Sequence, residues 1–251
     1  MVAYFKLQNN LLMLTGAALG IAAGIVIGSG LTYSMANYMY IFVLALFAFA
    51  GIVAGRIISF FCANWRLKRL YAILYQKGDG EEFFKRFLPF VNRVPVHTIE
   101  YIDGMHHLAY ACETLGNYDK ALQLLGSLEP EKLHLHSLAG TAVVCNQKMR
   151  LYLLSGRSQE ARQQLTHLQE IEKAAKVRAP MISANLRECI RLGKIWLSVI
   201  ENGQPINCDD YKYLKDEARL AKDSAYRREI EGLLRQISDR TNISGQVNFA
   251  P

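Results

Sequence analysis

Histidine is the residue type in this chain best suited to hold a metal ion, and the six histidines include two close pairs. His106 and His107 are adjacent, and His134 and His136 are two positions apart. Such neighbours on a helix point to different faces, whereas a shared metal ion needs ligands that converge on one point. We therefore predict surface or partly buried histidines here, and neither a metal site nor a cofactor.

The cysteines are equally poor candidates for chemistry. They number five and are widely spaced, at Cys62, Cys112, Cys145, Cys189 and Cys208. An odd number without a CxxC motif favours reduced thiols over a disulfide framework or a zinc site.

The sequence carries no nucleophile elbow, P-loop, dinucleotide fingerprint or HExxH motif. Asp209 and Asp210 fit the first turn of a helix, where carboxylates suit the macrodipole, better than a catalytic pair. We therefore predict that the protein is not an enzyme. The alternative is a hydrolase or transferase without these motifs, which would need a polar cleft with converging titratable groups.

Charge argues against a nucleic-acid partner. After Asn64 the chain has 27 basic and 22 acidic residues, and the two signs are interspersed. A modest, mixed excess does not make the basic stripe that nucleic acid requires. Some of the excess lies at residues 66–77, where we expect it to attract anionic membrane lipid. The basic residues at 212–222 are typical of a solvated helix face.

The first quarter of the chain has no charged residue between Lys6 and Arg56. Two apolar runs, residues 11–31 and 39–61, are each long enough as a helix to cross a hydrocarbon core of about 30 Å. The polar stretch 32–38 separates them. These features predict a transmembrane helical hairpin over residues 11–64.

The placement of basic residues predicts the orientation of this hairpin. The connection between the runs has no Lys or Arg, whereas Arg56, Arg66, Lys68 and Arg69 follow the second run. Basic residues near span ends favour the cytoplasmic side. We expect a multi-pass protein of the inner (cytoplasmic) membrane, with residues 1–10 and the C-terminus in the cytoplasm. In the alternative, the first run is a signal peptide cleaved at Ser34-Met35-Ala36.

Small residues form one face of the first run. Gly16, Gly20, Gly24 and Gly28 recur every fourth residue, and Gly51 and Gly55 repeat this spacing in the second run. Such a face lets another backbone approach closely. Either the two runs pack face to face within one hairpin, or the face contacts a second copy or a partner membrane protein.

Residues 65–240 have apolar positions at helical spacing and few glycines or prolines, which predicts an almost wholly helical domain. Nothing breaks the helical pattern between Arg56 and Lys77, so we expect the second run to continue into the first helix of this domain. Charged residues on one side of 225–239 predict a capping helix, and 241–251 reads as a tail.

The segment 108–130 resembles a tetratricopeptide repeat. It has Leu108-Ala109 in a first helix, Gly116 at a turn, Tyr118 two residues later, Ala121 in a second helix and Pro130 at the end. A second copy surrounds Gly156, a more degenerate one surrounds Gly78, and a fourth is predicted at Asn202-Gly203. The resemblance implies an all-α chain in which the hairpin precedes an α-solenoid of degenerate tetratricopeptide-like helix pairs.

The resemblance also implies a groove lined by the first helix of each pair. Carried over by register, its residues are Lys68, Tyr75, His106, Tyr110, Asn146 and Arg150. The cations and aromatic rings among them suit an extended peptide with acidic and apolar side chains. The alternative is that they are groove residues without a ligand. We expect a non-catalytic, membrane-anchored scaffold or adaptor that docks a protein partner; alternatively, the chain is an accessory subunit of a larger membrane complex assembled through the glycine-rich hairpin.

Overall fold

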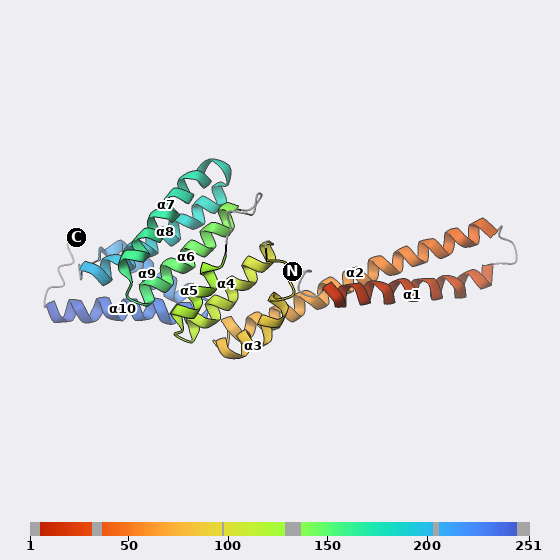
Figure 1. Cartoon of the computed structure of the whole chain (residues 1–251), viewed down its shortest axis with the longest axis horizontal. Coiled ribbons are helices and arrows are strands. Elements are labelled where there is room, and N and C mark those ends of the chain that lie inside the picture. Colours follow the sequence, from red (N-terminus) through yellow and green to blue (C-terminus); the bar gives the residue numbers. More distant parts are fainter. Residues whose placement is uncertain (1–5, 32–36, 97, 129–136, 203–205, 245–251) are drawn as a thin grey trace. The chain divides into compact units, whose positions relative to one another are not determined.

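The structure is a computed structural model that describes residues 6–31, 37–96, 98–128, 137–202 and 206–244 (Figure 1). These residues are all-α and include no strand. The helices are α1 (Lys6–Leu31), α2 (Asn37–Tyr75), α3 (Gly80–Val91), α4 (Ile99–Thr114), α5 (Tyr118–Gly126), α6 (Ser137–Leu154), α7 (Ser158–Arg178), α8 (Pro180–Asn202), α9 (Cys208–Leu220) and α10 (Ser224–Ser244).

The chain divides into two units, Met1–Leu70 and Tyr71–Pro251. The first unit contains α1 and most of α2. Both helices are long and apolar enough to cross a membrane, since an 18-residue window reaches a mean hydropathy of 2.0 in α1, at Asn10–Ile27, and of 2.5 in α2, within Ile41–Tyr75. The predicted separator 32–38 lies mostly outside the described residues, as does Ser34-Met35-Ala36.

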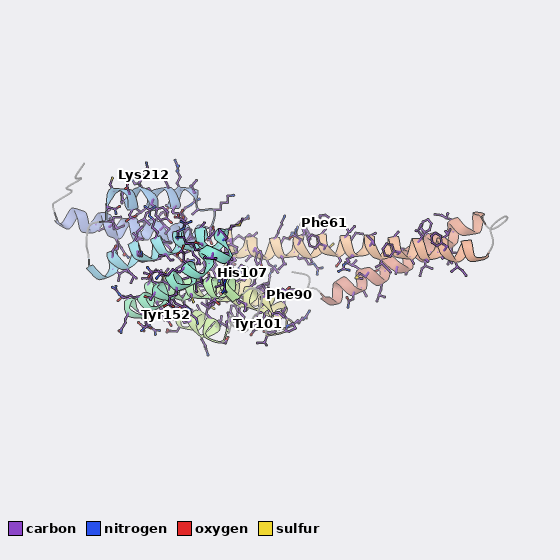
Figure 2. All side chains as sticks on the ribbon, turned by 90° about the horizontal axis from the view of Figure 1, so that it is seen from above. Phe61, Phe90, Tyr101, His107, Tyr152 and Lys212 are labelled. Carbon is purple, nitrogen blue, oxygen red and sulfur yellow. The ribbon has the colours of Figure 1, made fainter. Side chains whose placement is uncertain are left out.

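Large apolar side chains cover the outside of this hairpin. Leu14, Val26 and Phe49 each expose about two thirds or more of their surface, and Phe61 stands out from α2 (Figure 2). A soluble protein buries such side chains against other elements. Their exposure suits a hydrocarbon surrounding.

The glycines of α1 lie against α2. A Cβ atom added to Gly16 would collide with the carbonyl oxygen of Gly51, and one added to Gly55 would lie 2.5 Å from the carbonyl oxygen of Leu12. Gly20 meets backbone in the same way, and Gly24 meets the side chain of Leu44. The two helices therefore pack small face to small face within one chain. Gly28 belongs to α1, but its surroundings lie outside the described residues.

The second unit is built from consecutive helices that pack on one another. Helix α3 contacts α4, α4 contacts α5, α6 contacts both α7 and α8, and α10 contacts α9 and α8. Helix α4 also contacts α6, which joins the first helices to the rest. Many large side chains of the core are fully buried, among them Phe83, Phe87, Met149 and Ile230.

Three turns of the second unit have nearly the same geometry, and each places a glycine at positive φ. The φ angles are 68° at Gly78, 73° at Gly116 and 72° at Gly156. The Gly116 N–H donates to the Glu113 carbonyl over 2.9 Å, and the next N–H reaches back to Cys112 over 2.9 Å. This is the Schellman arrangement, in which a left-handed residue satisfies the last carbonyls of a helix.

The turn at Gly156 repeats this pattern of bonds, and the turn at Gly78 is one residue wider. The positions five residues after each glycine are all fully buried: Phe83, Ala121 and Ala161. Nine residues after each glycine, Phe87, Leu125 and Leu165 are buried as well. Each turn is therefore followed by a second helix whose buried positions lie at the same distances in sequence from the glycine.

Two sequence predictions fall partly outside the described residues. The predicted fourth turn includes Gly203, and the repeat around Gly116 is predicted to end at Pro130. Neither residue is described. Helix α10 extends to Ser244, so it continues four residues into the segment predicted as a tail. Helix α2 runs from Asn37 to Tyr75 without interruption, as expected from the absence of a breaker.

Candidate functional site

Five of the six residues predicted for the groove belong to the second unit. Tyr75 ends α2, His106 and Tyr110 lie in α4, and Asn146 and Arg150 lie in α6. Lys68 lies in the first unit, where its side chain is exposed. The structure therefore brings together members of the predicted set from α2, α4 and α6.

The α2 and α4 members of this set stack on each other and form hydrogen bonds to neighbouring residues. The rings of Tyr75 and Tyr110 stack with their centroids 5.4 Å apart. The Tyr75 hydroxyl lies 2.7 Å from Nδ1 of His107, and Nδ1 of His106 lies 2.7 Å from Oε1 of Gln147 on α6. Since an amide oxygen only accepts, His106 carries its proton on Nδ1. Burial and the adjacent His107 lower the pKa of His106 to about 4, so the ring is neutral at pH 7.

Arg150 is the centre of a buried ion-pair network. Its NH2 nitrogen donates to Glu113 on α4 over 2.8 Å and to Glu229 on α10 over 2.7 Å. The exposed fractions of these side chains are 15% for Arg150, 1% for Glu113 and 14% for Glu229. The positive charge of Arg150, which the sequence analysis assigned to binding an acidic peptide, is therefore already paired with two carboxylates of the same chain.

The network holds α4, α6 and α10 together. The Tyr110 hydroxyl donates to Asp223, just before α10, over 2.6 Å. Burial raises the pKa of Glu113 to about 7, while the Arg150 charge opposes the rise. The neighbouring carboxylate of Glu229 adds to this rise in the pKa of Glu113, since one cation does not fully compensate two negative charges.

Sequence reasoning missed the carboxylates of the C-terminal helix. Glu229 was assigned only to the charged side of a cap. Glu229 lies beside the buried Ile230, in a helix whose apolar stripe continues at Leu233 and Ile237. A charged residue beside such a stripe is ordinarily solvated, and only its burial, which the sequence does not show, requires a partner of opposite charge.

A cavity of about 270 Å³ adjoins this network. Its lining comes from α6, α8, α9 and α10, and comprises Asn146, Met149, Arg150, Glu188, Cys189, Leu192, Gly193, Trp196, Tyr213, Glu217 and Tyr226. Two of its polar atoms, Oδ1 of Asn146 and Nε of Arg150, are buried without a hydrogen-bond partner. Buried polar atoms are rarely left in this state, because each one costs about 1–3 kcal/mol.

The tyrosines of the cavity are held by glutamates. The Tyr226 hydroxyl donates to Glu217 over 3.1 Å. Burial, followed by Glu217, raises the pKa values of both Tyr213 and Tyr226, so both phenols are neutral. Glu188 also acts on Tyr213. The two tyrosines of the cavity lining therefore lie next to the carboxylates of Glu188 and Glu217.

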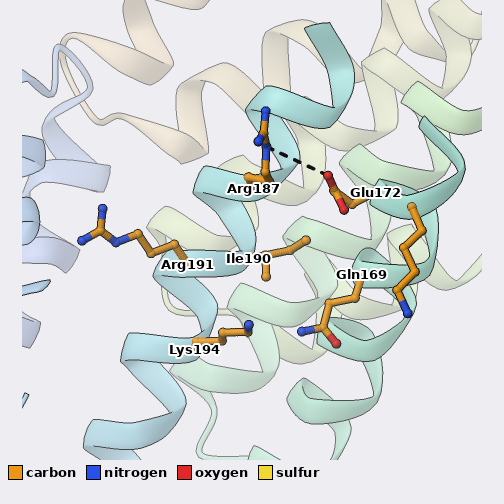
Figure 3. A pocket seen from close by; sticks show the side chains of 7 residues that line it. Gln169, Glu172, Arg187, Ile190, Arg191 and Lys194 are labelled. Atoms are coloured by element: carbon orange, nitrogen blue, oxygen red, sulfur yellow. Dashed lines mark ion pairs between the residues drawn. The ribbon is translucent and has the colours of Figure 1, made fainter. Parts of the chain in front are cut away.

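A second, more open cleft lies between α7 and α8, with a volume of about 510 Å³ (Figure 3). Its charged lining is mostly basic, with Lys173, Arg187, Arg191 and Lys194 against the single carboxylate of Glu172. Glu172 is held in place by the Ser183 hydroxyl at 2.7 Å and lies 4.0 Å from Arg187.

The two lysines of this cleft carry its free charge. Arg191 pairs with Asp210 at 2.9 Å. Among the described residues, neither Lys173 nor Lys194 has an ion-pair partner, and both are exposed. The cleft therefore offers cations to an anionic group.

Within the described residues there is no group of three metal-ligating side chains. His134 and His136 lie outside that part of the chain. None of the five cysteines, all of which are described, forms a disulfide; Cys112 and Cys145 are buried, and Cys208 is exposed. The basic residues predicted as a solvated face, Lys212, Lys215, Arg219 and Lys222, are all exposed, and Lys212 projects from α9 in Figure 2.

No known protein family matches this chain, and no curated protein or solved structure matches it either.

Proposed function

We propose that this chain is a membrane-anchored helical-repeat adaptor. The hairpin holds an α-solenoid of degenerate tetratricopeptide-like helix pairs at the cytosolic membrane face, where the solenoid docks a protein partner without catalysis. The observation that carries the proposal is the repeated turn, with Gly78, Gly116 and Gly156 all near φ 70° between successive helices. Stacked helix pairs of this kind present extended surfaces for binding.

The packing after each turn supports the tetratricopeptide-like interpretation. Ala121 and Ala161 are fully buried five residues after their glycines, where a small side chain allows two paired helices to approach closely. The turn glycines are 38 and 40 residues apart, against a family period of about 34. The solenoid that we propose is therefore irregular, with repeats longer than the family period.

The anchoring rests on the hairpin and on the charges beside it. The exposed apolar side chains of α1 and α2 suit lipid, and the basic residues that follow suit the cytoplasmic side. We expect the exposed thiol of Cys208 to resist a membrane-impermeant maleimide in intact cells and to react after permeabilisation. Labelling in intact cells would reverse the proposed orientation.

The cleft between α7 and α8 is the surface that we assign to the partner. Arg150 is already paired with Glu113 and Glu229. An acidic peptide would therefore find no unpaired cation at Arg150. The cleft instead presents Lys173 and Lys194, with Ile190 among its lining residues. An acidic segment with apolar side chains complements this surface.

Site-specific photo-crosslinking in native membranes tests the proposal. A photoreactive amino acid is placed in the full-length chain at Lys173 or Lys194 in the cleft, and at Lys85 or Arg235 as exposed controls. Crosslinked products are identified by mass spectrometry. We expect both cleft positions to capture one and the same protein, and the controls to capture none of it.

The alternative function, an accessory subunit assembled through the hairpin, predicts a different pattern. The glycine face is used inside the hairpin, so a partner subunit would contact outward residues such as Leu14 or Phe49. Crosslinks from these positions, with none from the cleft, would favour the accessory-subunit function over the adaptor function.

A further inference from the structure

We propose that the cavity lined by α6, α8, α9 and α10 binds an alkylammonium or guanidinium group, most favourably the side chain of a lysine or arginine in a bound protein segment. The cavity shares no lining residue with the α7–α8 cleft. The inference therefore goes beyond the proposed docking there and is tested separately.

The first argument is an excess of hydrogen-bond acceptors. Glu188 and Glu217 line the cavity, and Oδ1 of Asn146 is buried with no donor. Arg150 is the single cation of the lining, and its charge is met by Glu113 and Glu229. A group that brings several N–H donors and a positive charge satisfies these acceptors, whereas an anion would be repelled.

The second argument is the aromatic lining, formed by Trp196, Tyr213 and Tyr226. Ring faces attract cations through the ring quadrupole. The chain itself uses two of these rings in this way, with the Arg191 guanidinium 4.3 Å from the centre of Tyr213 and that of Arg150 5.5 Å from the centre of Tyr226. Arg191 is paired with Asp210, so its charge does not oppose a further cation.

The third argument concerns the source of the cation. Nε of Arg150 is a buried donor without an acceptor. A free diamine has no oxygen to accept this bond, whereas a lysine or arginine residue brings its own peptide carbonyl. A volume of about 270 Å³ is below the ~300–1,000 Å³ of sites for drug-sized ligands. It suits one side chain with its peptide group.

Three probes separate these possibilities on the full-length protein in detergent, by isothermal titration calorimetry. They are N-acetyl-lysine-methylamide, the neutral analogue N-acetyl-norleucine-methylamide, and 1,4-diaminobutane. We expect the lysine probe to bind at least tenfold more tightly than the norleucine probe, and more tightly than the diamine. If the lysine probe and the diamine bind equally, the cavity is a cation site, but its ligand is a free amine rather than a side chain of a protein segment.

Variants locate the binding in the cavity. Glu217→Gln and Asn146→Leu should each weaken the lysine probe by about tenfold or more, while Glu170→Gln, an exposed change on α7, should leave it unchanged. Circular dichroism checks that each variant folds, and the three-probe comparison on the unmodified chain decides the question if a variant does not. No binding of any probe, or equal binding of the lysine and norleucine probes, would overturn the proposal.

Discussion

Arg150 on α6 donates a hydrogen bond of 2.7 Å to Glu229 on α10, although the two residues are 79 positions apart. The same nitrogen bonds Glu113 on α4. One side chain thus links three helices that are distant in sequence. This makes the C-terminal helix an integral part of the second unit rather than an added cap.

Replacing Arg150 by methionine should strongly destabilise the second unit. The change leaves Glu113 and Glu229 buried without a cation, and breaking a buried pair in this way costs about 3–5 kcal/mol. Urea unfolding followed by circular dichroism measures the loss. Arg219→Met is the control, because Arg219 and its partner Asp216 are exposed. An Arg150 variant as stable as this control would mean that the network does not hold the helices together.

The helix pairs and the hairpin could be predicted from the sequence, but the Arg150 network could not. A glycine turn such as that at Gly116 and an uncharged apolar run are local patterns, and local backbone preferences decide both. The bond between Arg150 and Glu229 depends on how α10 returns to α6, and no spacing in the sequence encodes that return. Because the sequence does not show this long-range packing, it predicted that Arg150 would be available to a partner.

Two groups close to Arg150, the buried Glu113 and the partly buried His106, should give opposite dependences of stability on pH. The pKa of Glu113 is raised to about 7 from an ordinary 4.5, so between these values the folded chain holds a proton that the unfolded chain has lost. Its contribution to stability therefore falls as pH rises through this window. The pKa of His106 is lowered to about 4 from 6.5, so between these values the unfolded chain holds the extra proton, and stability rises with pH.

Single variants should reveal the two slopes, which oppose each other between about pH 4.5 and 6.5 in the natural chain. In Glu113→Gln the free energy of unfolding should increase with pH over this range, because the His106 contribution is left. In His106→Asn it should decrease with pH. Urea unfolding at several pH values tests this, and slopes of the same sign in the two variants would contradict the assignment.

The turn glycines should be sensitive to alanine because of their backbone conformation alone. A Cβ at Gly116 or Gly156 meets nothing within 4 Å, but φ is above +70° at both. Gly116→Ala and Gly156→Ala should each lower stability by about 1 kcal/mol. Gly232, inside α10, also has free space around it without a positive φ, so Gly232→Ala should raise stability by about 0.5–1 kcal/mol. Thermal unfolding of the three variants provides the comparison, and equal effects would reject the turn geometry.

The glycine face of the hairpin should tolerate no added methyl groups. Gly16 and Gly51 face each other's backbone, so Gly16→Ala and Gly51→Ala should each force α1 and α2 apart. Ala18 is exposed on α1, and Ala18→Ile is the control that adds more bulk away from the contact. Titration of the reconstituted chain with SDS should unfold the glycine variants at lower detergent than the control. Unchanged midpoints combined with loss of self-association would instead assign the glycine face to a second copy.

The adaptor proposal is tested most directly by reversing the charge of the α7–α8 cleft. The double variant Lys173→Glu with Lys194→Glu is compared with Lys85→Glu with Arg235→Glu, which changes the net charge equally at exposed positions outside the cleft. Both are made in full-length chains that carry a photoreactive residue at Gln169, also in the cleft lining, and the yield of crosslinked partner in native membranes is measured. We predict at least a tenfold loss of yield for the cleft variant and no loss for its control. An unchanged yield for the cleft variant, or an equal loss for both, would contradict the account.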